Sequence, residues 1–280
     1  MFLGQLLSQN KRFRRVHDAK CANTSYAFVL PLLSFNLISM FVSSQLLNAL
    51  LQITLILPLL FFGKGRFNKD EYRLLGIFVV MFVLWSVITN GLGGVVVGNG
   101  QSWNWVGKVS GLLLGVFFVY RNKLITHNEI GWKLNFNPGS VKPVLFTLIL
   151  ILLARSIFYI TFEHQVKTFD LETLIFQGTL AGLCDELLFR GILLALLNRV
   201  FTAKENVFGF TLSYGILISS ILYGLSQGFL LREGFHLQIN LIRILIGFFL
   251  GLIAAVLKER SGSLLPAVLF HNIWALIANH

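Results

Sequence analysis

The residues best placed to do chemistry stand in the stretch GLCDELLFRG, residues 182–191, in the middle of a long apolar segment. It contains two adjacent carboxylates, Asp185 and Glu186, and one cation, Arg190. Charged side chains inside a bilayer are costly, so they usually face a cavity or a partner. On a helix Glu186 and Arg190 lie four residues apart in the favourable order and can pair. Asp185 points about 100° away from Glu186, so the motif itself gives this carboxylate no partner.

Other polar side chains in the last apolar runs could join this carboxylate. Ser226 and Gln227 occur in YGLSQGF, His271 and Asn272 occur in SLLPAVLFHNIWALIAN, and His236 lies in the loop between two runs. A carboxylate, an amide and an imidazole on three neighbouring helices could converge on one buried polar site.

A second motif overlaps the Gln227 segment. GLSQG, residues 224–228, fits G-x-S-x-G, but that pattern marks a serine nucleophile only at a strand-to-helix turn. Here it lies in a helical run, so a Ser226–His271 dyad is a minor alternative. Cys21 and Cys184 form no metal or disulfide pattern, and no HExxH occurs. We therefore predict neither a metal nor another cofactor.

The composition indicates the surroundings of these residues. The 280-residue chain is 55% hydrophobic and 12% charged, with a mean hydropathy of +0.75, which is typical of a multi-pass α-helical membrane protein. The net charge of +11 does not indicate a nucleic-acid partner, because the cations lie between apolar runs, where the positive-inside rule places them. The expected surroundings are a lipid bilayer.

We predict an all-α fold, a polytopic transmembrane bundle of about eight to nine spans. The N-terminus is cytoplasmic in this prediction, since nearly all Lys and Arg between runs then fall inside, and Lys167 and Arg232 outside. Residues 1–20 form an interfacial helix in this interpretation. The predicted spans cover residues 26–62 (two spans that break near residues 43–45), 74–97, 105–120, 141–162, 174–200, 208–231, 237–257 and 264–278.

A few residues inside these runs need their own explanation. Lys108 lies near the end of a run, where its ammonium could reach the membrane surface, whereas Arg155 and Arg243 lie deeper and are expected to pair. Small-residue spacings favour close helix packing, although ordinary glycine usage explains them equally well. These spacings are Gly178/Gly182, Gly224/Gly228 and Gly247/Gly251.

DELLFRG, SSILYGLSQGF and GSLLPAVLFHNIWALIAN, in this order, resemble the three motifs of the CPBP family. That family groups CAAX prenyl endopeptidases with bacteriocin-processing and self-immunity proteins, and its pattern is Glu-Glu-x-x-x-Arg, Phe-x-x-x-His, then His-x-x-x-Asn or Asp. The resemblance covers residues 140–280 and implies a CPBP-like core there, after N-terminal membrane helices in residues 1–139. It implies a bacterial cell membrane protein.

The resemblance implies hydrolysis of peptide bonds in or at the membrane by a carboxylate-activated water, without an obligatory zinc. It places Asp185 as the first acid, Gln227 at the histidine of the second motif, and His271 at that of the third. Family knowledge assigns the water to the first acid and the second-motif histidine, and the oxyanion to the third-motif residues. Glu186 and Arg190 match the remaining positions of the first motif.

The sequence departs from the family pattern at four positions, one of which is Tyr223 in place of the Phe of the second motif. Asp185 is shorter than Glu by one methylene, and Gln227 can orient a water but cannot accept its proton. Ala275 stands where the family has Asn, although Asn272 lies three residues earlier on nearly the same face. Loss of an oxyanion donor costs about 10²–10³ in rate, and loss of a base about 10²–10⁴. His236 replaces the base only if its loop folds inward.

Two functions follow from these matches and departures. The first is an endopeptidase acting on a membrane-associated peptide or protein, with a site made of five residues. These are Asp185, Glu186, Arg190, Gln227 and His271. The alternative is a catalytically silent family member that acts as a membrane binding, regulatory or immunity protein. A role for the polar residues in helix packing alone remains a third interpretation.

Overall fold

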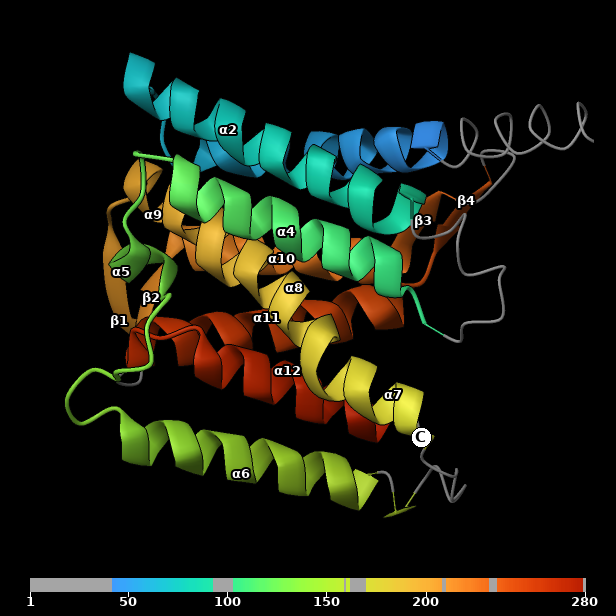
Figure 1. Cartoon of the computed structure of the whole chain (residues 1–280). Coiled ribbons are helices and arrows are strands. Elements are labelled where there is room, and N and C mark those ends of the chain that lie inside the picture. Colours follow the sequence, from blue (N-terminus) through green and yellow to red (C-terminus); the bar gives the residue numbers. More distant parts are fainter. Residues whose placement is uncertain are drawn as a thin grey trace, which may run out of the picture.

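The computed structural model describes residues 42–92, 103–158, 160–161, 170–207, 210–231 and 236–278. In this part of the chain, long helices run in roughly one common direction, with α2 and α6 at opposite edges (Figure 1). A helix over Val42–Phe62 comes first. The labelled elements are α2 (Lys69–Ser86), η1 (Val87–Leu92, a π-helix), α4 (Trp105–Arg121), α5 (His127–Ile130), α6 (Val141–Phe158), α7 (Leu171–Ile175), η4 (Phe176–Leu180, π), α8 (Ala181–Glu186), η5 (Leu187–Leu193, π), α9 (Leu194–Val200), β1 (Lys204–Val207), β2 (Phe210–Ser213), α10 (Tyr214–Gly228), β3 (Phe229–Leu231), β4 (Leu237–Ile239), α11 (Leu241–Ser261) and α12 (Leu265–Ala278).

The structure confirms an all-α membrane bundle. Four helices in the described residues are long and apolar enough to cross a bilayer. Their bounds are Val42–Phe62, Lys69–Gly91, Val141–Phe158 and Leu241–Ser261. The number of spans and the cytoplasmic N-terminus stay predictions. The predicted interfacial helix and the first half of the predicted hairpin lie outside the described residues, and residues 43–45 fall in the first turn of the first described helix.

Polar residues set several helix ends. Asn68 caps α2 and forms a capping box with Glu71, so each side chain binds the other's free backbone N–H. At the other end of the chain Asn240 caps α11, which stops at Gly262 with φ of +68°. Glycine adopts this left-handed conformation without steric penalty, so the turn into α12 is sharp.

The predicted spans 208–231 and 237–257 are wrong at their ends. Strands β2 and β3 replace the two ends of the first span, and β4 replaces the start of the second. β2 pairs with β1, which precedes the span, and β3 pairs with β4, both antiparallel. The Ser213 hydroxyl accepts the N–H of Ile216 and so begins α10 at Tyr214. Short apolar stretches form strands as well as helices, and the capping residue Ser213 marks where helix begins. Figure 1 shows β1 and β2 at one end of the bundle and β3 and β4 at the other.

The element from Leu171 to Val200 forms the centre of the bundle. Its helical path is continuous through α7, η4, α8, η5 and α9, which agrees with the predicted span 174–200. The side chains of η5 are all buried. The whole element from Leu171 to Val200 packs against α2, α4, α10 and α12, so Asp185, Glu186 and Arg190 lie deep inside the protein.

Two helices of the core meet backbone to backbone at glycines. A Cβ atom on Gly224 of α10 would lie 2.6 Å from the carbonyl oxygen of Ile244, and one on Gly228 2.5 Å from that of Asn240. These distances leave no room for a side chain, so the close packing of α10 on α11 is confirmed. At Gly178 the nearest atom would be Leu276 Cδ1 at 3.8 Å, which is ordinary contact.

Candidate active site

Glu186 and Arg190 form the expected buried ion pair. Arg190 Nε lies 3.1 Å from Glu186 Oε2, and each side chain is 1% exposed. The contact between these two atoms does not have the geometry of a hydrogen bond. The Arg190 guanidinium also lies 4.2 Å from the ring centre of Tyr223. Both residues line a cavity of about 30 Å³, large enough for a water molecule.

The His271 ring lies between the two carboxylates. Its Nδ1 is 2.8 Å from Glu186 Oε1, and its Nε2 is 4.0 Å from Asp185 Oδ2. A buried carboxylate next to Nδ1 favours the tautomer with the proton on that nitrogen. Nε2 then carries the lone pair, 4.0 Å from Asp185 Oδ2. The sequence alone gave no measure of this separation, which is short enough for one water to bridge both groups.

Asp185 has a partner that the sequence analysis missed. Lys108 of α4 donates a hydrogen bond to its Oδ1 atom and lies 5.5 Å from the ring centre of Trp85. The prediction that Lys108 reaches the membrane surface is therefore wrong. Its side chain faces inward because α4 packs closely on the central element at Gly111, where a Cβ would lie 3.1 Å from Cys184 Sγ.

A sequence signal for this contact existed. Gly107, Gly111 and Gly115 recur every fourth residue along α4 and are all buried. Such spacing marks a face that contacts another helix. Lys108 lies three residues before Gly111, and therefore near this face. The glycine pattern could have assigned Lys108 to the bundle interior.

A cavity of about 660 Å³ brings the remaining predicted residues together. Asp185, Gln227 and His271 line it, as do Lys108 and Ala275. Gln227 is exposed, and the hydrogen bond from its amide nitrogen to Ser226 Oγ is long, at 3.5 Å. Three elements that are separate in sequence, α8, α10 and α12, thus contribute to one chamber.

Asn272 does not replace the missing asparagine at position 275. Its amide nitrogen donates to the carbonyls of Gly178 and Thr179, at 3.0 and 3.2 Å, and its Oδ1 accepts the Gly182 N–H at 2.8 Å. The two carbonyls belong to the π-helix η4, whose irregular backbone leaves groups that need outside partners. Asn272 therefore stabilises the central element and has no free donor for an oxyanion.

The alternatives raised by the sequence find little support. Ser226 lies inside α10 and donates to the Tyr223 carbonyl at 2.7 Å, so it is not at a strand-to-helix turn. His236 is exposed and is not among the described residues that line the cavity. Arg155 pairs as expected, donating to the Ile277 carbonyl and lying 5.5 Å from the Trp274 ring centre.

Arg243 behaves differently from Arg155. It is exposed and lines the large cavity. Among the described residues, no group of three or more His, Cys, Asp or Glu side chains is arranged to hold a metal ion. The metal-free, cofactor-free site stays a prediction.

Comparison with known proteins gives one similarity for this part of the chain. Residues 167–277 match the model of type II CAAX prenyl endopeptidase Rce1-like proteins. This part of the chain is therefore similar to Rce1-like proteins. The similarity agrees with the CPBP resemblance of the three motifs, while the domain boundary at residue 140 stays a prediction. Lys108 lies outside the matched residues. Neither the curated proteins nor the solved structures gave a match.

Proposed function

We propose that the protein is an intramembrane endopeptidase in which Asp185 and His271 hold the attacking water. The observation that carries this function is the 4.0 Å separation of His271 Nε2 and Asp185 Oδ2 in a cavity of about 660 Å³. A water between the two groups is within hydrogen-bond reach of both, the first requirement of general base catalysis. The Rce1-like match supports a peptide as the substrate.

The orientation of His271 suggests its role. The protonated Nδ1 of His271 donates to Glu186 Oε1, so Nε2 carries the lone pair and is the basic nitrogen. The water gives a proton to Nε2 as its oxygen attacks the carbonyl carbon of the peptide. The C–N bond then breaks, and His271 returns this proton to the leaving amine. This role differs from the family assignment, which gives this histidine the oxyanion, because Gln227 cannot act as the base.

Asp185 and Gln227 complete the proposed site. Lys108 donates a hydrogen bond to Asp185 Oδ1. The other oxygen, Oδ2, can therefore accept a hydrogen bond from the water and orient it. The exposed amide of Gln227 in the same cavity can donate to the developing oxyanion. Gln227 would be one oxyanion donor where the family has two, so we predict a low turnover rate.

The apolar walls of the cavity indicate the kind of peptide. Trp103, Phe176 and Trp274 line it beside the polar groups, and cavities of this size and character bury large parts of their ligands. A hydrophobic peptide segment from a membrane protein fits these walls.

The test is cleavage of hydrophobic peptides by the full-length protein in lipid vesicles, followed by mass spectrometry. Asp185→Asn and His271→Gln should each lower kcat by at least about 10². Asp70→Asn and His236→Ala change the same residue types at exposed positions and should leave kcat unchanged. Cleavage that survives Asp185→Asn would refute the proposed mechanism.

The silent alternative is favoured by one observation, the ion pair between Lys108 and Asp185. If the pair only stabilises the fold, peptides will bind in the cavity and leave intact. Binding measured by peptide fluorescence would then be equal in wild type and Asp185→Asn, and no product would form with either.

A further inference from the structure

An apolar cavity lies beside the segment that follows α5. Its volume is about 340 Å³, within the range of ligand sites. Leu183 of α8 and Leu265 and Val268 of α12 form part of its wall, and Trp132 and Lys133 lie at its other side. The wall is almost entirely hydrocarbon, which suits an acyl chain.

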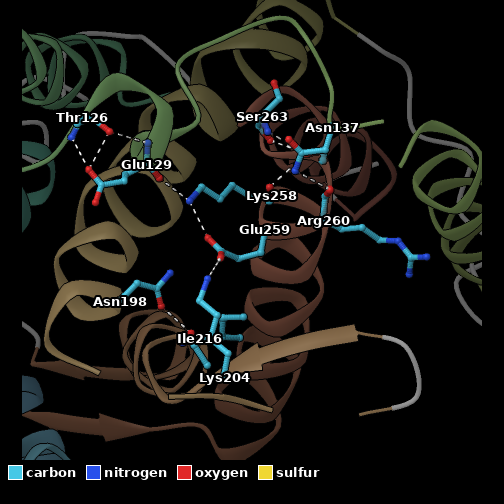
Figure 2. A network of polar contacts seen from close by, with 12 residues as sticks. Thr126, Glu129, Asn137, Asn198, Lys204, Ile216, Lys258, Glu259, Arg260 and Ser263 are labelled. Atoms are coloured by element: carbon cyan, nitrogen blue, oxygen red, sulfur yellow. Dashed lines mark hydrogen bonds and ion pairs between the residues drawn. The ribbon is translucent and has the colours of Figure 1, made fainter. Parts of the chain in front are cut away.

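A charged cavity of about 330 Å³ adjoins it and shares Lys133 as a lining residue. Four cations and two carboxylates line this second cavity, so the cations are in excess. They are Lys133, Arg199, Lys204, Lys258, Glu129 and Glu259. Figure 2 shows Glu259 between Lys204 and Lys258.

The ion pairs account for three of the four cations. Glu129 binds Arg199, with Nε at 2.7 Å from Oε1, while Glu259 binds Lys258 at 2.8 Å and Lys204 at 3.4 Å. Within the part of the chain that the structure describes, no ion pair involves Lys133. The excess positive charge is thus available at the boundary between the charged and the apolar cavity.

Backbone contacts hold Lys133 at this boundary. The Ser263 hydroxyl donates to the Lys133 carbonyl at 2.5 Å, and Lys258 Nζ donates to the Glu129 carbonyl at 2.6 Å. The Asn137 N–H donates to the Ser261 carbonyl at 2.7 Å. The segment after α5 is therefore fixed to the turn between α11 and α12, and Figure 2 shows part of this attachment.

We infer that these two cavities bind one anionic phospholipid, with the phosphate near Lys133 and an acyl chain against Leu183, Leu265 and Val268. Charge complementarity favours an anionic over a zwitterionic headgroup. Trp132 beside Lys133 is the residue pair expected where a protein meets the headgroup layer. The inner leaflet, the predicted position of this end, is the one that attracts basic segments. This inference does not depend on the proposed peptidase activity.

The test is native mass spectrometry of the full-length protein with equimolar phosphatidylglycerol and phosphatidylcholine of equal chain length. We expect one phosphatidylglycerol to be retained in preference to phosphatidylcholine. Lys133→Gln keeps the backbone contact to Ser263 and should weaken phosphatidylglycerol binding about fivefold, the effect of one cation at a membrane surface. Val268→Phe fills the apolar wall and should reduce binding of both lipids.

Matched control variants distinguish binding at this site from general effects of surface charge and surface hydrophobicity. Lys142→Gln removes an exposed cation outside both cavities, and Leu113→Phe enlarges an exposed apolar side chain on α4. Neither should change lipid binding, and unchanged thermal midpoints would show that all variants fold. Equal retention of the two lipids by wild type, an equal effect of Lys142→Gln, or displacement by inorganic phosphate would overturn the inference.

Discussion

Two charge clusters of similar composition occupy very different surroundings in this molecule. The central cluster lies inside the bundle and consists of Lys108, Asp185, Glu186, Arg190 and His271. The end cluster lies near α5 and β1 and consists of Glu129, Arg199, Lys204, Lys258 and Glu259. Each has two carboxylates paired with cations.

The ion pair with the better hydrogen-bond geometry is expected to contribute less to stability than the pair with the poorer geometry. Glu129 and Arg199 make two short hydrogen bonds, at 2.7 and 2.9 Å, yet their side chains are 35% and 43% exposed. Glu186 and Arg190 meet at 3.1 Å without hydrogen-bond geometry, yet both are 1% exposed. Bulk water replaces a lost partner in the first case, whereas in the second a small cavity offers room for about one water molecule and the remaining charge stays buried. Burial therefore decides how much each pair matters.

The largest effect is expected at the centre. Arg190→Met leaves Glu186 charged and buried beside His271 alone, which should lower the free energy of unfolding by about 3–5 kcal/mol. An SDS titration monitored by tryptophan fluorescence measures this change. Arg190→Met with Glu186→Gln should recover part of the loss, because no orphaned charge remains. A loss below about 1 kcal/mol would contradict the contrast between the clusters.

Lys108→Met should come next. Its side chain is 18% exposed, so the orphaned Asp185 can draw in some water, and we expect a loss of about 3 kcal/mol, near the lower limit for a buried pair. Adding Asp185→Asn should restore stability in the same titration. If the double variant is no more stable than the single one, the pair is not the reason for the loss.

A third prediction concerns the clamp on the central element. In Gly182→Ala the new Cβ would lie 2.2 Å from Asn272 Oδ1, and we expect about 1–3 kcal/mol of destabilisation from overpacking. Gly178→Ala is the matched control on the same helix, since its Cβ meets only Leu276 Cδ1 at 3.8 Å. Equal thermal midpoints for both variants would show that the Asn272 side chain can move aside at little energetic cost.

The smallest effect is expected at the end cluster. Burial alone would raise the pKa of Glu129, but hydrogen bonds from Arg199 and Thr126 outweigh it and lower the pKa from 4.5 to about 2. Its contribution to stability is therefore complete above about pH 5 and is lost as the pH falls toward 2. Arg199→Gln should cost about 0.2–1 kcal/mol at pH 7.

Thermal midpoints across pH test this prediction. The difference between wild type and Arg199→Gln should shrink below pH 4.5, because Glu129 then begins to protonate in the unfolded chain. Arg121→Gln, an exposed cation at the same end, should show no such trend. A difference that persists unchanged to pH 2 would mean that Arg199 acts through packing.

The sequence predicted those features that lie within one helix or one motif. The Glu186–Arg190 pair follows from their spacing, and α4 and α12 closely match the predicted spans. Contacts between helices were harder to predict, because the direction of a side chain depends on which neighbour packs where. Lys108 was missed for this reason. The role of Asn272 was missed because nothing in the sequence marks η4 as a π-helix.

The length of α10 has a consequence for the surrounding bilayer. Its 15 residues measure about 22 Å, less than the roughly 30 Å of hydrocarbon in a typical membrane. The exposed strand β4 beside its end cannot lie in lipid, because unpaired strand edges are not tolerated there. Gln227 stands one residue before the end of α10, next to these strands, so we expect the aqueous phase to reach close to this side chain. Water then has a short path to the proposed reaction inside the membrane.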